Sequence, residues 1–300
     1  MSGKIRFAPS PTGYLHEGHL LSALYVWAAA KKWDLKIHLR IEDHDQNRAR
    51  PAYIAGIRED LEWLGFKYDS ESIQSARGPI YEAALQKLVD KSLVYPCYCS
   101  RKQLLAENPQ SETGEIIYQG KCKHLVILSE SEGSSKVLFD NSAPHNLRFI
   151  VPNKVIDWHD LRLGDFHENP KLQCGDFPIR DRDNQWTYQF AVCVDDIDEQ
   201  ITHIVRGEDI RNSTARQIAL MEALGRKERA VYLHHPLIVD DNNKKLSKRE
   251  LAHSLRQDKE AGITPEMLFG RVCHKAHLTE SDFPITLIDA ISIIMDQIPT

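Results

Sequence analysis

The first residues whose types and spacing suggest chemistry are two histidines near the start of the sequence. His16 and His19 enclose Gly18, and they follow Arg6–Gly13, a short apolar strand that breaks at two prolines and a glycine. A long helical segment begins directly afterwards, so both imidazoles should lie at a helix N-terminus, which favours an anion. Imidazoles one turn apart suit a polyphosphate whose charge grows during a reaction. The alternative is an ordinary strand–loop–helix connection that carries two surface histidines.

A second candidate is the basic segment Lys245-Leu246-Ser247-Lys248-Arg249, which follows a polar turn. A lysine ammonium on a mobile loop can follow a pyrophosphate as negative charge moves onto the leaving group. Most basic segments of this length are solvated loops, so the pentapeptide alone is weak support. Together with the two histidines it favours phosphate chemistry.

Three cysteines form a third candidate: Cys97, Cys99 and Cys122 lie in a segment with little apolar character of its own. Thiolates at this spacing suit a structural zinc ion. From chemistry alone, His124 would be the fourth ligand. The alternative is three free cysteines in a core. The remaining cysteines are isolated and are predicted to be core residues: Cys174, Cys193 and Cys273.

Composition limits the class of protein. The chain has 300 residues, 42% of them hydrophobic and 27% charged, which is typical of a globular protein of roughly two domains. A formal net charge of −5 argues against non-specific coating of nucleic acid, although a local basic patch can still bind RNA. We expect no targeting peptide, no membrane span and no disulfide framework. The sequence therefore predicts a cytoplasmic protein.

The order of the expected elements predicts an α/β fold. Strands that alternate with helices form a parallel sheet with right-handed crossovers, and its ligand lies beyond the C-terminal ends of the strands. The loop that carries His16 and His19 follows the first expected strand, so it lies beyond the C-terminal end of that strand. The expected elements of this first part are a buried helix over Leu20–Lys32, a strand over Leu35–Glu42, a helix from Pro51 to Gly65 and a helix over Ile80–Lys91.

The periodicity fails from Tyr95 to about Phe139, and we interpret this segment as an insertion between two halves of the sheet. We divide the chain into a first catalytic half (1–94), the cysteine-bearing insertion (95–145), a second half (146–250) and a helical C-terminal region (251–300). The later expected elements are strands over Leu147–Val151, Gln185–Val194 and Ile201–Arg206, and helices over Ser213–Leu224, from Thr264-Pro265 onwards and near Pro284–Ile298.

Several of these segments resemble the signatures of class I aminoacyl-tRNA synthetases. Arg6–Gly13 with His16-x-Gly18-His19, and Lys245-Leu246-Ser247-Lys248, are similar to the two signatures of that class. Arg40–Asp43 and Val205–Asp209 resemble the glutamyl branch. The resemblance covers roughly residues 4–260. It implies a Rossmann-like catalytic domain with a zinc-bearing insertion and a short helical C-terminal region.

The resemblance implies a glutamate pocket. Arg6, Tyr188 and Arg206 would hold the side-chain carboxylate, for which a guanidinium is a natural partner. Glu42 would accept the α-ammonium group; the alternative for Arg40 and Glu42 is a surface cross-strand pair. The implied glutamate-binding residues are Arg6, Phe7, Ala8, Pro9, Ser10, Glu42, Tyr188 and Arg206.

The resemblance also implies how ATP is used. His16, His19 and Lys248 would stabilise the transition state at the α-phosphate as glutamate attacks ATP. The resemblance implies that ATP is bound together with Mg²⁺. Two positions depart from the signatures: Arg249 stands in place of a serine, and Glu17 is tolerable only if its carboxylate points away from ATP. The implied ATP-binding residues are His16, Gly18, His19, Glu208, Lys245, Leu246, Ser247, Lys248 and Arg249, with Asp209 as a weaker candidate.

Two further features are the spacing of the cysteines with Tyr118 and the short segment after Arg249. Both resemble a group of shortened paralogues that attach glutamate to queuosine in the anticodon of tRNA(Asp). The resemblance favours Tyr118 over His124 as the fourth ligand of one structural zinc ion. About 50 residues follow Arg249, too few for an anticodon-binding domain. The expected partners are therefore L-glutamate, ATP and tRNA(Asp) carrying queuosine, bound by a monomer.

Three alternatives remain. A minimal glutamyl-tRNA synthetase would charge a tRNA 3′ end instead. A nucleotidyltransferase that makes a dinucleotide cofactor would need neither the basic signature nor Arg206. An inactive paralogue that only binds is disfavoured by intact His16, His19 and Lys248.

Overall fold

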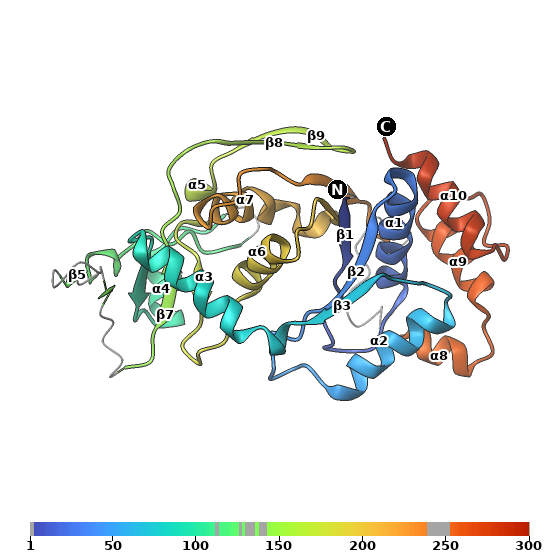
Figure 1. The fold of residues 1–300 in the computed structure, drawn as a ribbon, viewed down its shortest axis with the longest axis horizontal. Coiled ribbons are helices and arrows are strands. Elements are labelled where there is room, and N and C mark those ends of the chain that lie inside the picture. Colours follow the sequence, from blue (N-terminus) through green and yellow to red (C-terminus); the bar gives the residue numbers. More distant parts are fainter. Residues whose placement is uncertain are drawn as a thin grey trace.

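The computed structural model describes residues 3–111, 114–125, 128–129, 136–137, 143–238 and 253–299. Its main sheet has seven strands in the order β3-β2-β1-β11-β12-β8-β9 (Figure 1). The neighbouring strands from β3 to β8 are parallel, and β8 and β9 form an antiparallel hairpin. The predicted parallel α/β sheet is confirmed. The strands are β1 (Lys4–Phe7), β2 (Lys36–Ile41), β3 (Ser70–Ile73), β8 (Ile156–Asp160), β9 (Gly164–Glu168), β11 (His203–Gly207) and β12 (Val231–His235).

The helices predicted from apolar periodicity and from capping residues are confirmed. Pro51 and Pro265 occupy the first turns of their helices, where a missing backbone N–H group costs nothing. Thr264 caps the second of them by accepting a hydrogen bond from the backbone N–H of Met267. The helices are α1 (Glu17–Trp33), α2 (Pro51–Trp63), α3 (Gly78–Asp90), α7 (Thr214–Ala223), α8 (Leu255–Glu260), α9 (Pro265–Lys275) and α10 (Leu287–Gln297).

Helix α1 is buried on nearly every side. Of the residues from Leu20 to Ala30, all but Ser22 are buried. The sheet covers one side of α1, and α9 and α10 lie along another (Figure 1). A helix enclosed in this way has no solvent face, which explains why the sequence of α1 is apolar all round. Burial of each large aliphatic side chain contributes about 2 kcal/mol to this packing.

One predicted strand is wrong. Gln185–Val194 was expected to be a strand, but helix α6 runs from Tyr188 to Asp198. Its aromatic and β-branched residues favour a strand by composition. Tertiary packing decides otherwise, because Phe190 and Val192 of α6 pack into one core cluster with side chains of α3 and α7. The carboxylates at the end of α6 meet the buried arginines described below.

A second, three-stranded antiparallel sheet has the order β10-β7-β4 and lies at the other end of the molecule (Figure 1). Strand β7 confirms the strand expected near Leu147. The sequence patterns missed β3, β4, β10, β12 and the β8–β9 hairpin, because most of them have only three to five residues. The elements at this end are β4 (Val94–Cys97), α4 (Arg101–Glu107), β5 (Leu128–Ser129), β6 (Lys136–Val137), β7 (Asn146–Phe149), α5 (Pro170–Cys174) and β10 (Pro178–Arg180).

Candidate functional site

The two histidines lie at the first turn of α1. His16 is the N-cap residue: its Nδ1 accepts a hydrogen bond from the backbone N–H of Gly18 at 3.1 Å. The backbone N–H of His16 in turn donates to Nδ1 of His19 at 3.2 Å. A ring nitrogen that accepts carries no proton, so in the neutral form both rings carry their proton on Nε2. The proton of each neutral ring is therefore on the nitrogen that does not accept from the backbone.

Gly18 allows the two rings to pack together. A Cβ atom at this position would lie 3.0 Å from Cε1 of His16, tighter than ordinary contacts. The centroids of the two imidazoles are 3.9 Å apart. The group that lies against this glycine is therefore the ring of His16.

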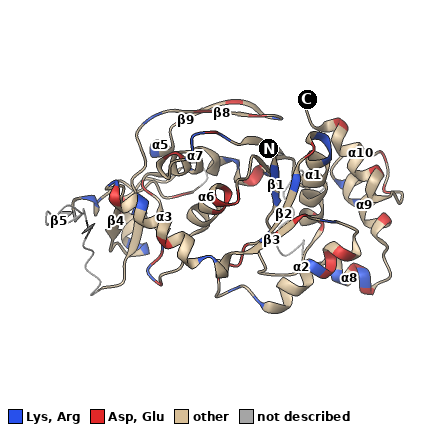
Figure 2. Cartoon of the chain, in the orientation of Figure 1, with Lys and Arg blue, Asp and Glu red and all other residues tan. Residues whose placement is uncertain are grey.

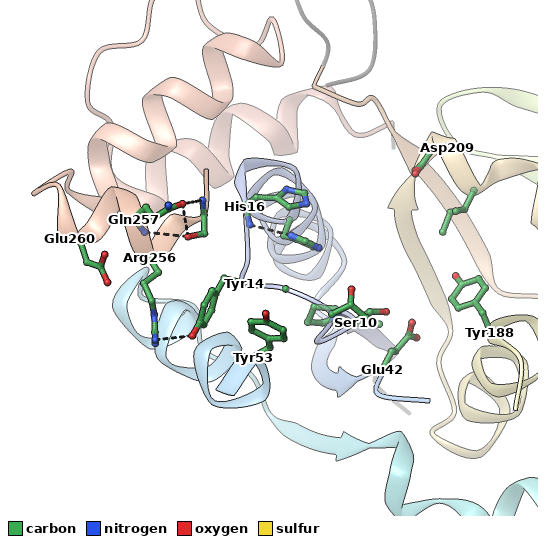
Figure 3. Close-up of a pocket in the computed structure, with 17 residues that line it drawn as sticks. Ser10, Tyr14, His16, Glu42, Tyr53, Tyr188, Asp209, Arg256, Gln257 and Glu260 are labelled. Carbon is green, nitrogen blue, oxygen red and sulfur yellow. Dashed lines mark hydrogen bonds between the residues drawn. The ribbon is translucent and has the colours of Figure 1, made fainter. Parts of the chain in front are cut away.

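A cavity of about 980 Å³ opens beside this helix N-terminus (Figure 3). It lies at the C-terminal ends of β1 and β2, near the point where the strand order reverses between β1 and β11. The candidate residues Ala8, Pro9, Ser10, His16, His19, Glu42, Tyr188 and Asp209 all line it. Thr12 and Gly13 of the first signature also line it. The other lining residues, which the sequence did not single out, are Tyr14, Tyr53, Ile210, Ser254, Arg256, Gln257 and Glu260.

Five other candidates do not line the cavity: Arg6, Phe7, Gly18, Arg206 and Glu208. Phe7 packs into the core, where its ring meets Trp27 edge to face at 5.7 Å. Glu208 forms an ion pair with Arg162. Burial raises the pKa of the Tyr188 hydroxyl, and the charge of Glu42 adds to that shift while the charges of Arg206 and Arg6 oppose it.

Glu42 and Tyr188 form one end of the cavity, opposite Arg256, Gln257 and Glu260 (Figure 3). Glu42 is 4% exposed, and burial raises the pKa of its carboxyl above the ordinary value. The charge of Arg40 opposes that shift, because Nε of Arg40 donates to Oε1 of Glu42 at 3.3 Å. The exposed cross-strand pair considered for Arg40 and Glu42 is therefore wrong.

Arg40 is fully buried within a cluster of charges that connects β1, β2 and α6. Its Nη1 donates to Oδ1 of Asp196 and to Oε2 of Glu199, both at 2.8 Å. The same Oδ1 of Asp196 accepts from Nε of Arg6 at 3.0 Å. Figure 2 shows the acidic residues of α6 facing the basic residues of β1 and β2. One carboxylate thus bridges the arginines of two neighbouring strands.

Sequence reasoning missed this cluster. The signal was present as Asp195-Asp196 directly after an apolar run. Two adjacent carboxylates at the end of a buried segment require buried cations. A strand over this segment would point Asp195 and Asp196 to opposite faces, whereas the helix brings both carboxylates to arginines.

Arg206 has different surroundings. It is 5% exposed, and its three nitrogens donate to Nε2 of His234 at 3.0 Å, Oε1 of Gln217 at 2.6 Å and Oγ1 of Thr214 at 2.8 Å. In the described part of the chain no carboxylate forms an ion pair with it.

Two departures from the signatures have different outcomes. The carboxylate of Glu17 forms ion pairs with Arg271 at 2.7 Å and Lys275 at 2.6 Å, both on α9. It therefore points away from the cavity, as required. The basic segment Lys245–Arg249, including the departure at Arg249, lies outside the described residues.

The three cysteines of the insertion meet in space. Cys97, Cys99 and Cys122 are buried, and their sulfur atoms all lie within 4.8 Å of one another. Oη of Tyr118 lies 3.4 Å from Sγ of Cys97 and 3.6 Å from Sγ of Cys99, whereas His124 is exposed and outside the group.

These distances fit a metal ion. Two ligands of a tetrahedral zinc ion are separated by about 3.5 Å for sulfur and oxygen and by about 3.8 Å for two sulfurs. Sγ of Cys99 and Sγ of Cys122 are 3.5 Å apart. Three cysteines and Tyr118 can therefore surround one ion, and Tyr118 is better placed than His124. The other three cysteines are buried and free, as predicted.

Comparisons with known proteins agree on a family. The model described as "tRNA synthetases class I (E and Q), catalytic domain" matches residues 4–283. A protein of Neisseria gonorrhoeae named Glutamyl-Q tRNA(Asp) synthetase is 36% identical over 297 residues, which cover 98% of this chain and 96% of that protein. The glutamate–tRNA ligase of Aquifex aeolicus is 39% identical over 273 residues, 90% of this chain but 56% of the ligase.

Solved structures agree with this result. The crystal structure of glutamate-tRNA synthetase from Elizabethkingia anophelis superposes with a TM-score of 0.75 at 26% identity, covering 97% of this chain and 65% of that one. The chain thus spans a little over half of the Aquifex ligase. Within the described residues, no helix is both long and apolar enough to cross a membrane.

Proposed function

We propose that this chain, which belongs to the class I tRNA synthetases of the glutamate and glutamine branch, activates L-glutamate with ATP to give glutamyl-adenylate and pyrophosphate. The observation that carries the proposal is a shared cavity. His16 and His19 at the start of α1 line the same cavity as Glu42 and Tyr188. One cavity thus joins an anion site to an acceptor for an ammonium group.

The α-phosphate of ATP binds at the N-terminus of α1 in this proposal. The Nε2–H groups of His16 and His19 donate to its oxygens, together with the helix dipole. Negative charge at phosphorus grows as the glutamate α-carboxylate attacks and pyrophosphate leaves. Preorganised donors stabilise that charge without rearranging, which lowers the barrier. By the family resemblance, Lys248 and Mg²⁺ would neutralise the leaving group.

Glutamate binds at the end of the cavity formed by Glu42 and Tyr188. Glu42 accepts the α-ammonium group, and Arg40 holds the Glu42 carboxylate in place. The side-chain carboxylate points toward Arg206, supported by Arg6 and the Tyr188 hydroxyl. Arg206 suits this role because its guanidinium has only neutral partners among the described side chains.

The acceptor in our proposal is queuosine in the anticodon of tRNA(Asp). The support is the relative from Neisseria gonorrhoeae that is named Glutamyl-Q tRNA(Asp) synthetase. This chain matches 96% of the length of that relative. A minimal glutamyl-tRNA synthetase, which charges a tRNA 3′ end, is the second candidate. The 39% identity to a glutamate–tRNA ligase supports that candidate.

We also propose that Cys97, Cys99, Tyr118 and Cys122 hold one structural zinc ion. Four protein ligands leave no open position, so the ion would stabilise the insertion and take no part in the reaction. The support is the distance fit of the four ligand atoms.

Exchange of labelled pyrophosphate into ATP tests the activation step. We expect glutamate-dependent exchange without any tRNA, and little exchange with aspartate. Absence of exchange with glutamate, in the presence and absence of tRNA, would overturn the proposed activation. Exchange that requires tRNA would favour the minimal synthetase.

Nuclease mapping tests the acceptor. The protein is incubated with ATP, labelled glutamate and tRNA(Asp), prepared with and without queuosine. We expect label only on the queuosine-containing tRNA, in the anticodon fragment. Label at the 3′-terminal fragment of either preparation would assign the second candidate.

A further inference from the structure

We propose that two cations of α9, Arg271 and Lys275, neutralise Glu17 so that the first turn of α1 can accept a phosphate group. They are positioning residues, because they act on the anion site through Glu17 and do not touch the ligand. The inference rests on the proposed function, since it takes the histidine turn to bind a phosphate group of ATP. It gives the C-terminal helices a part in that binding.

Glu17 places a negative charge where the site has to attract one. It is the first residue of α1 and stands directly after His16. The positive end of the helix dipole stabilises an acidic side chain in the first turn in the same way as it stabilises a bound anion. An unpaired carboxylate at this position would therefore compete with a phosphate group and also repel it. A carboxylate here is compatible with ATP only if its charge is balanced.

Helix α9 supplies one cation for each oxygen of this carboxylate. Oε1 of Glu17 lies 2.7 Å from Nε of Arg271, and Oε2 lies 2.6 Å from Nζ of Lys275. Arg271 and Lys275 are four residues apart, so they lie on the same face of α9. The Glu17 side chain is only 12% exposed, so water and salt screen these pairs only in part. The charge of Glu17 is thus balanced on the side that faces α9.

Arg271 also connects Glu17 to α8, the helix that contributes Arg256, Gln257 and Glu260 to the cavity. Nη2 of Arg271 lies 2.7 Å from Oδ1 of Asp258, which is 2% exposed. Two carboxylates, from α1 and from α8, therefore meet at one guanidinium. Lys275 differs, because Glu17 is its only ion-pair partner in the described part of the chain. Removal of the Lys275 charge consequently changes the balance at Glu17 alone.

The pairs with Glu17 contribute little to holding α9 in place. The side chains of Arg271 and Lys275 are 28% and 41% exposed, and ion pairs at such positions stabilise a fold only weakly. Apolar packing already attaches the helix, because Phe269 and Val272 of α9 belong to the same core cluster as the buried residues of α1. The helix does not need these charges for its attachment, whereas the Glu17 carboxylate needs them beside an anion site.

Second-site rescue tests the inference. Lys275→Gln and Arg271→Gln each remove one cation, and each is also combined with Glu17→Gln, which removes the charge that the cation balances. Lys154→Gln is the control, because it breaks a lysine–glutamate pair with Glu222 at 2.8 Å, and neither residue lines the cavity. Calorimetric titration with ATP gives the Kd of each protein, and thermal unfolding shows that each is folded.

We expect the Kd for ATP to rise about 5-fold in Lys275→Gln and in Arg271→Gln, because Glu17 then carries an unbalanced charge. Each double variant should return to within about 2-fold of the wild-type Kd, and Lys154→Gln should leave it unchanged. A Kd that stays raised in both double variants would overturn the inference, because the damage would then lie in the fold and not in the charge of Glu17. An unchanged Kd in both folded single variants would overturn it as well.

The two cations differ in how far their removal endangers folding. Arg271→Gln also takes a partner from the buried Asp258, so this variant can fail to fold. In that case Lys275→Gln and its double variant decide alone, since Lys275 pairs with Glu17 and not with Asp258.

Pyrophosphate exchange separates these outcomes from failure of the proposed function. If the wild type binds ATP with the expected pattern of rescue but does not activate glutamate, the proposed function fails and the inference stands. If the wild type activates glutamate and the double variants show no rescue, only the inference fails. A wild type that does not bind ATP overturns both.

Discussion

The cavity beside α1 and the cysteine group beside β4 are assembled in opposite ways. At the cavity, Arg6 and Asp196 are 190 residues apart in sequence, and Arg40 and Glu199 are 159 apart. The sulfur atoms and the phenol of the cysteine group come from a segment of about 25 residues. The first site is thus held by tertiary charge pairs. The side chains of the second meet through contacts between sulfur and phenol oxygen atoms.

The comparison shows where each site gets its stability. Buried charges of opposite sign compensate one another, so the cavity wall can fold without a ligand. The cysteine group forms a core cluster of only five buried residues, which provides little buried apolar area, so the proposed metal ion would add free energy to its folding. Changes at the cavity should therefore leave the zinc content intact, and changes at the cysteine group should leave the charge pairs beside the cavity intact.

The largest expected effect is loss of the metal. Cys97→Ser removes one of four ligands, and the zinc content should fall from about one ion per chain to near zero, because binding to structural sites depends on the complete ligand set. Metal analysis of the purified protein measures this. Cys273→Ser, a buried cysteine of the main core, should keep its zinc. A folded wild type that contains no zinc would assign the three cysteines to a core instead.

A second change should affect only the cavity. His19→Ala removes a donor to the α-phosphate and should reduce the rate of glutamate activation by about 10²–10³-fold, while the zinc content stays at the wild-type value. Pyrophosphate exchange gives the rate. His203→Ala, at a half-buried position on β11, is the control. An undiminished rate in the His19 variant would remove this residue from the proposed role.

The third change breaks the charge cluster. Asp196→Asn preserves shape but leaves Arg6 and Arg40 with one carboxylate fewer, so the free energy of unfolding should fall by about 3 kcal/mol. Urea denaturation measures it. Asp198→Asn, whose side chain is half exposed in its pair with Arg77, should change stability by less than about 1 kcal/mol. Equal effects from both variants would show that the cluster contributes no more than a surface pair.

The smallest effect is a gain in stability that depends on pH. Burial raises the pKa of Asp60 from 3.8 to about 6, against the opposing charges of Arg256 and Lys259. The ionised carboxylate is therefore unfavourable in the folded state, fully so above pH 6 and not at all below about pH 4. Asp60→Asn should increase the free energy of unfolding by about 2 kcal/mol at pH 8, with the gain vanishing near pH 4. Glu62→Gln, exposed on the same helix, should show no such dependence.

The sequence predicted the parts of the molecule that depend on local patterns. Helix α1 and its histidines follow from apolar periodicity and an N-terminal loop, and strand β2 follows from alternation. The cysteine group was found for a similar reason, since its ligands are close in sequence. The choice of Tyr118 over His124 came from resemblance, and the side-chain positions agree with it.

Long-range pairs could not be predicted in this way. Nothing local in Asp196 identifies Arg6 and Arg40 as its partners, and the aromatic residues of α6 favoured a strand by composition. The short strands β3, β4 and β12 carry too few residues for a period to be read. The partners of Arg206 were missed for the same reason, because Thr214, Gln217 and His234 meet only when α7 and β12 pack beside β11.

The carboxylate of Asp196 has a consequence for synthesis of the chain on the ribosome. Strands β1 and β2 emerge long before α6, so for most of translation Arg6 and Arg40 lack their bridging partner. Packing these arginines into a core at that stage would bury two cations without a counterion. The N-terminal half therefore cannot complete its packing early in translation. The native sheet forms only after residue 196 has left the exit tunnel.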